Sequence, residues 1–221
     1  MQPGGSRAQD YRANGYVLLD KLFSPVVLSI FHGKLQSDLN LRGDPAFVSQ
    51  TWLHTKPALE VYSRGYAPMA TFHWGLTPTA AAIAGCDLVP TYAYFRVYQQ
   101  DDICVIHADR PACEHSISLT IELADNHPWA LCVGKEQLES PSQRTNPAFD
   151  SDEAFTELPM RAGDAVMYRG VTHRHGRIEP NPNRWSAHLF LHWVEADGQY
   201  ADHAFDRVAV EKAKAGNQSA Q

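Results

Sequence analysis

The segment YFRVYQQDDICVIHAD, residues 94–109, carries the strongest structural information in this chain. It joins a run of β-branched and aromatic residues to His107 and Asp109, which stand two positions apart. Side chains two positions apart in a strand point to the same face. The imidazole of His107 and the carboxylate of Asp109 are therefore predicted to converge on one point.

Short segments of the same character occur near the N-terminus and throughout the second half of the chain. They are rich in β-branched and aromatic residues and are separated by turn residues, a pattern typical of short strands. The predicted strands lie at residues 15–20, 91–98, 116–123, 130–133, 165–168 and 186–194. Residues 139–153 are polar and contain two prolines, which predicts a loop.

Helix signals are confined to the first half. Ser24-Pro25 precedes apolar residues at helical spacing, and Thr77-Pro78 precedes an alanine-rich run that ends at Gly85. A serine or threonine N-cap followed by proline marks a helix start. Helices followed by many strands, without regular βαβ alternation, predict a β-sheet pair or barrel supported by helices.

The length of 221 residues fits a single domain with a sizeable core. We expect this domain to span residues 1–221, with helical support at 8–89 and a barrel core at about 90–197. The four cysteines include no CxxC pair, so we expect free thiols.

The charge balance indicates the class of partner. A net charge of −6 opposes binding to nucleic acid or to an anionic membrane, so a small molecule or a peptide is expected instead. No secretory signal or membrane-spanning run is present in the sequence, which predicts a cytoplasmic protein. The oligomeric state is not determined by these patterns.

A third candidate ligand follows in the segment GDAVMYRGVTHRH, residues 163–175. Its two histidines, His173 and His175, share one face, and we favour His175. Two histidines and one carboxylate form a facial triad, which leaves open positions on an octahedral Fe(II) ion.

Nine residues beyond His175, the sequence reads Arg184-Trp185-Ser186. Arg184 and Ser186 are predicted to share one face of the next strand, where a guanidinium can bind a carboxylate through two parallel hydrogen bonds. This pair is suited to the far end of a dicarboxylic acid such as 2-oxoglutarate. Arg177 is the next candidate for this role.

The ordered set of HxD, distal histidine and Arg-x-Ser resembles the signature of Fe(II)- and 2-oxoglutarate-dependent dioxygenases. The resemblance is narrower for the prolyl-4-hydroxylase-like branch, and it covers roughly residues 10–197. It also includes Tyr98, nine residues before His107, and the segments 90–92, 163–166 and 190–194. The sequence departs from the branch at Asp101, where a glycine is usual in the turn before HxD.

The resemblance implies a mainly β fold with flanking helices around a double-stranded β-helix, the jelly-roll core shared with cupins. It implies that His107, Asp109 and His175 are the catalytic Fe(II) ligands. It places Arg184 and Ser186 at the C5 carboxylate of 2-oxoglutarate and Tyr98 as a further contact to this co-substrate. The implied reaction uses O2, releases succinate and CO2, and hydroxylates a C–H bond, because halogenating relatives lack the carboxylate ligand.

Two alternatives and several roles stay open. A cupin-like metal-dependent hydrolase or isomerase would use the same triad without 2-oxoglutarate, and a binding module would keep the barrel without metal. The roles of Arg96, Arg110 and His188 are undecided. The primary substrate cannot be identified, although its determinants are expected in segments 41–75 and 139–153.

Overall fold

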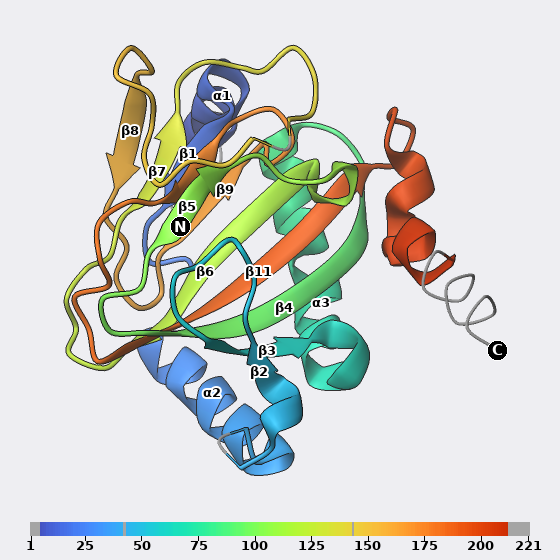
Figure 1. Ribbon diagram of the computed structural model, residues 1–221. Helices are drawn as coiled ribbons and strands as arrows, with labels where there is room; N and C mark the ends of the chain where they lie inside the picture. The colour runs from blue at the N-terminus through green and yellow to red at the C-terminus, as the bar shows by residue number, and fades with distance from the viewer. Residues whose placement is uncertain (1–4, 42, 143, 212–221) are drawn as a thin grey trace, which may run out of the picture.

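Two antiparallel sheets face one another in the computed structural model, which describes residues 5–41, 43–142 and 144–211 (Figure 1). The larger sheet has the strand order β1 (Tyr16–Leu19), β9 (Ala165–Tyr168), β6 (His115–Leu123), β11 (Trp185–Glu195), β4 (Leu88–Gln99), β3 (Ala58–Tyr62) and β2 (Val48–Ser49). The smaller sheet has the order β5 (Cys104–His107), β10 (His175–Arg177), β7 (Leu131–Gly134) and β8 (Phe155–Leu158).

Three α-helices support the larger sheet: α1 (Gly5–Asn14), α2 (Pro25–Leu39) and α3 (Ala67–Ala84). Short 3-10 helices lie at Pro45–Phe47, Ser63–Gly65, Pro111–Cys113 and Ala201–Asp206. The largest apolar cluster joins residues of all three helices, such as Tyr11, Leu28 and Met69, to the outer face of the sheet. The helices therefore cover one face of the larger sheet, while the smaller sheet lies against the other.

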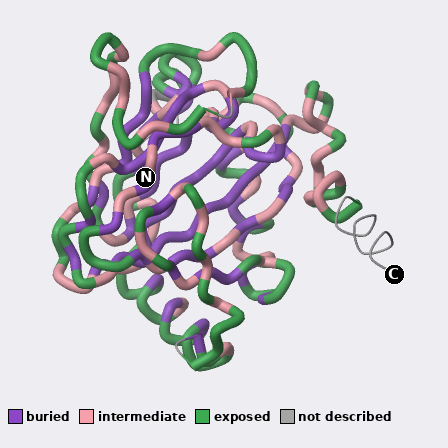
Figure 2. The backbone as a smooth tube through the Cα atoms, in the orientation of Figure 1, coloured by how far each residue is buried: buried purple, intermediate pink, exposed green. Residues whose placement is uncertain are grey.

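The central strands are buried on both faces, but the two faces differ in chemistry (Figure 2). On β11, Leu189 and Leu191 belong to the apolar cluster on the helix side. The alternate residues His188 and His192 belong to the opposite face, because neighbouring side chains in a strand alternate. The space between the sheets is thus lined by polar groups as well as aromatic ones, which is where a chemical site can form.

The fold confirms the predicted mainly β architecture with flanking helices, and each predicted strand has a counterpart. The predicted start of the second helix was wrong. α3 begins at Ala67, and Pro78 lies inside it. Ala67-Pro68 supplies the N-terminal proline, and the buried face from Met69 to Ile83 continues through Pro78. That apolar packing outweighs the backbone hydrogen bond that a proline cannot donate.

Two further expectations can be compared with the structure. All four cysteines are free thiols, as predicted. Among the described residues, no helix combines the length and the apolar character needed to span a membrane.

Candidate metal centre

His107, Asp109 and His175 meet at one end of the smaller sheet. His107 is the last residue of β5 and pairs directly with His175, the first residue of β10. The Nε2 atoms of His107 and His175 lie 3.6 and 3.5 Å from the two carboxylate oxygens of Asp109. One potential ligand atom from each residue lies within 4.8 Å of the others. The three side chains can therefore contact a single metal ion.

Backbone carbonyls orient both imidazoles. His107 Nδ1 lies 2.7 Å from the carbonyl oxygen of Val105, and His175 Nδ1 lies 2.9 Å from that of His173. A protonated Nδ1 that donates to a carbonyl leaves the lone pair on Nε2. Both lone pairs then face the Asp109 carboxylate, which is the arrangement that a metal ligand requires.

Asp109 follows β5 in a loop held by its neighbours. Its backbone N–H donates to the carbonyl of Gly170 at 2.8 Å, and Ser116 Oγ lies 3.4 Å from its carboxylate. A Cβ atom added to Gly170 would overlap the Asp109 carboxylate oxygen. The absence of a side chain at Gly170 therefore leaves the space that the Asp109 carboxylate occupies.

The electrostatics match a cation site. Burial raises the pKa of Asp109, but the adjacent His175 and His107 lower it by more. The pKa of Asp109 therefore lies well below its usual range. Burial lowers the pKa of His175 to about 4 despite the nearby Asp109. At neutral pH the group therefore presents a carboxylate and a neutral imidazole, which are the forms that ligate a divalent metal.

His173 occupies a different position. Its ring packs against Gly15, where an added Cβ would overlap it, and its Nδ1 lies 3.2 Å from Thr172 Oγ1. The structure places His173 outside the metal-binding group and gives it the role of orienting His175 through its carbonyl.

The triad lines a narrow, partly open cavity of about 20 Å³ between the sheets. This volume holds about one water molecule. Leu53 is a lining residue from the loop before β3, and its carbonyl accepts a hydrogen bond from the backbone of Val105. The other lining residues include Tyr94, Arg96, Tyr98, Arg177, Phe190 and His192.

Arg96 has a carboxylate partner within the protein. Its Nε donates to Glu60 at 2.6 Å, and its Nη1 donates to the Tyr98 hydroxyl at 2.9 Å. Arg96 and Glu60 are both buried. Of the two roles left open for Arg96, the structure supports the internal ion pair. Tyr98 lines the same cavity as the triad.

Arg177 is a buried cation of a different kind. It is 1% exposed, and the described residues provide no carboxylate within ion-pair distance. Its hydrogen-bond partners are weak or neutral: the Trp129 carbonyl at 2.6 Å, Ser118 Oγ at 3.5 Å and His188 Nδ1 at 3.3 Å. Burial lowers its pKa. The guanidinium also lies over the Trp129 ring at 4.7 Å, and a buried charge without a carboxylate partner is costly.

The structure does not bring Arg184 and Ser186 to this cavity. Arg184 directly precedes the first residue of β11. Its side chain is 72% exposed, and its Nε donates to Asp125 at 2.9 Å. Ser186 is buried, but its hydroxyl donates to Asn181 at 2.7 Å. Arg177, the next candidate from the sequence, lines the cavity of the triad, whereas Arg184 and Ser186 do not.

Arg110 and His188 also have defined surroundings. Arg110 pairs with Asp206 at 2.8 Å, and its guanidinium lies 4.3 Å over the Tyr92 ring. His188 is fully buried beside Arg177, and its Nε2 has no hydrogen-bond partner.

From the sequence, Arg177 was only the second candidate for binding a carboxylate, and His192 had no assigned role in the site. His192 lines the cavity, and its Nδ1 lies 2.8 Å from Ser116 Oγ. The available signal was the alternation of polar residues within strongly apolar strands, as at Ser116, Ser118 and Thr120 on β6. Such polar positions in a strand buried on both faces indicate a polar interior.

Comparisons with known proteins establish the fold. No protein-family model matches the sequence, and no curated protein matches it. The solved structure of SnoK, a non-heme alpha-ketoglutarate-dependent carbocyclase from nogalamycin biosynthesis, matches with a TM-score of 0.68 at 14% identity. That match covers 87% of this chain and 84% of SnoK.

Two further structures match over similar lengths. The epimerase SnoN, in complex with Fe3+, alpha ketoglutarate and nogalamycin RO, has a TM-score of 0.67 at 14% identity, covering 87% of this chain and 84% of its own. A prolyl-4-hydroxylase from Pseudomonas putida has a TM-score of 0.57 at 12% identity, covering 86% and 98%. The chain therefore has the jelly-roll fold of these non-heme iron enzymes, as the sequence predicts.

Proposed function

We propose that the protein is an Fe(II)- and 2-oxoglutarate-dependent oxygenase that hydroxylates a C–H bond of a small molecule, an amino acid or a peptide. One observation carries this proposal: a candidate 2-His-1-carboxylate centre and an uncompensated buried arginine line the same cavity. The relatives in fold act with alpha ketoglutarate, which agrees with this assignment.

The donor set fits Fe(II). Two neutral imidazole nitrogens and one carboxylate bind one side of an octahedral ion and leave three positions for exchangeable ligands. His107, Asp109 and His175 would hold the ion. When bound, it would activate O2 together with 2-oxoglutarate, which is converted to succinate and CO2.

Arg177 would bind the C5 carboxylate of 2-oxoglutarate. His175 and Arg177 are two positions apart on β10, about 6.6 Å along the strand, and they share a face. This separation suits a five-carbon dicarboxylate with one end at the metal and the other at the guanidinium. Asp109 and the two carboxylates of 2-oxoglutarate would balance the charges of Fe(II) and Arg177.

Other lining residues would position the reactants and exclude water. Tyr98 is held by Arg96 and reaches the same cavity, so its hydroxyl is available as a contact to the co-substrate. Tyr94 and Phe190 stack at 4.7 Å and form an apolar wall. Leu53 also lines the cavity, and its loop lies in the segment expected to contribute to substrate choice.

The test is O2-dependent formation of succinate from 2-oxoglutarate by the protein reconstituted with Fe(II). Wild type should form succinate, and candidate substrates should be ranked by how strongly they stimulate it. Asp109→Ala should form none. If the protein with bound Fe(II) forms no succinate under any substrate mixture, the cupin-like hydrolase or isomerase becomes the better assignment.

A further inference from the structure

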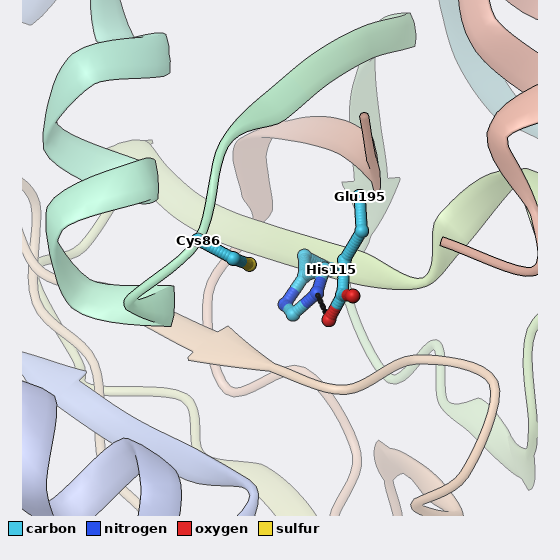
Figure 3. Close-up of side chains that lie close together, drawn as sticks. All are labelled: Cys86, His115 and Glu195. Carbon is cyan, nitrogen blue, oxygen red and sulfur yellow. Dashed lines mark hydrogen bonds and ion pairs between the residues drawn. The ribbon is translucent and has the colours of Figure 1, made fainter. Parts of the chain in front are cut away.

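A second group of metal-binding side chains lies on the helix side of the larger sheet. Cys86 follows α3, His115 begins β6 and Glu195 ends β11, and Figure 3 shows the three side chains gathered together. One potential ligand atom from each lies within 4.8 Å of the others. The neighbouring Ser116 faces Asp109 from the opposite side of β6, so the sheet separates this group from the candidate iron centre.

His115 is held in an orientation suited to a ligand. It is buried, and its Nδ1 lies 2.7 Å from the Tyr11 hydroxyl. Its Nε2 lies 3.4 Å from Glu195 Oε1 (Figure 3). A neutral histidine whose Nδ1 is occupied by a hydrogen bond presents Nε2 to a metal.

The charges around the group favour a divalent cation. Glu114 lies against Glu195, whose backbone N–H donates to Glu114 Oε2 at 2.9 Å. Glu114 and Glu195 bring two carboxylates to one surface cavity, and Arg169 offsets only one of them. Burial and Glu195 raise the pKa of the Cys86 thiol to about 11, so metal binding would release its proton.

The group is also accessible. Glu114, His115, Arg169 and Glu195 line a surface cavity of about 150 Å³. The Glu195 side chain is 43% exposed, which provides a path for an ion to enter. The cavity has room for a water molecule in a fourth coordination position.

We propose that Cys86, His115 and Glu195 bind a zinc ion at a site separate from the candidate iron centre. Thiolate, imidazole and carboxylate are zinc ligands, and a water molecule completes the tetrahedral geometry that zinc prefers. The ion would join the end of α3 to the start of β6 and the end of β11. This site does not depend on the proposed oxygenase activity.

The experiment uses the variant His107→Ala/Asp109→Ala, in which the other metal-binding group is disabled. This protein should bind one equivalent of Zn(II) or Co(II). The Co(II) form should show a near-ultraviolet thiolate-to-cobalt band and the strong visible bands of tetrahedral coordination. Adding Cys86→Ser should remove the thiolate band and weaken Co(II) affinity roughly a hundredfold, since losing a ligand costs at least as much as losing its supporting partner.

Cys132→Ser in the same background is the matched control, because Cys132 is a buried free thiol on β7. It should retain the thiolate band. The proposal fails if the double variant binds no Co(II), or if the thiolate band persists in Cys86→Ser. Should Cys86→Ser fail to fold, Glu195→Gln replaces it: a loss of affinity of at least about tenfold supports the site, and unchanged affinity overturns it.

Discussion

Arg177→Ala should weaken 2-oxoglutarate binding severely while leaving Fe(II) binding nearly unchanged. Arg177 is 1% exposed and has no carboxylate partner among the described residues, so the co-substrate would be the anion that neutralises it. Removing one member of a desolvated charge pair costs about 2–5 kcal/mol. The dissociation constant for 2-oxoglutarate should therefore rise by roughly thirty-fold to several thousand-fold.

The assay is calorimetric titration of the anaerobic Fe(II) complex with 2-oxoglutarate. Arg177→Lys should recover only part of the affinity, because lysine keeps the charge but lacks the planar fork of donors. Circular dichroism should confirm that each variant is folded, since Arg177 also donates to the Trp129 carbonyl.

Arg184→Ala is the matched control. Its side chain is 72% exposed and paired with Asp125, so its removal should change 2-oxoglutarate affinity by less than about twofold. A large loss in Arg184→Ala together with unchanged affinity in Arg177→Ala would refute the assignment and restore the role first expected for Arg184.

Three other perturbations test the remaining parts of the structure. His107→Ala, Asp109→Ala and His175→Ala should each abolish succinate formation and Fe(II) binding measured by metal analysis, whereas His173→Ala should retain bound iron because its ring lies outside the group. Gly170→Ala should displace Asp109 and weaken Fe(II) affinity by roughly tenfold to a hundredfold. Gly33 has open space around it, so Gly33→Ala should leave metal binding unchanged. Equal Fe(II) affinities in the two variants would contradict the close approach of Gly170 to Asp109. Burial lowers the pKa of His73 from 6.5 to about 4, so the unfolded chain binds a proton below pH 6.5 that the folded protein binds only near pH 4. Stability of the metal-free protein should therefore fall as pH drops through this window, by up to about 1.4 kcal/mol per pH unit from His73, and urea unfolding of His73→Phe should show a shallower pH dependence than wild type.

Much of the architecture could be predicted because most strands carry their own signal. The strand at Ala165–Tyr168 was predicted at its observed bounds, since its apolar run is bounded by turn residues. β5 and β10 have only four and three residues, too few for a periodic pattern, so their positions depend on pairing within the sheet. The HxD spacing nevertheless placed His107 and Asp109 together, even though Asp109 lies in the loop after β5.

The proposed anchor for the dicarboxylate, Arg177, does not follow from sequence spacing alone. Arg184 and Ser186 have the expected order in the sequence, but β11 begins at Trp185, and Asp125 binds the Arg184 side chain at the surface. Arg177 is a candidate for binding the co-substrate because it is buried without a carboxylate partner. This property appears only when the two sheets are assembled. Similarly, α3 extends ten residues before the predicted start because its buried face, not its local capping signal, determines its length.

The visible absorption of the anaerobic protein with Fe(II) and 2-oxoglutarate tests the proposed chemistry most directly. Chelation of iron by the keto oxygen and C1 carboxylate produces a metal-to-ligand charge-transfer band that neither ligand gives alone. We expect the band in wild type and its absence in Asp109→Ala. A wild-type protein that binds one Fe(II) at His107, Asp109 and His175 but shows no band at saturating 2-oxoglutarate would contradict the assignment as a 2-oxoglutarate-dependent oxygenase.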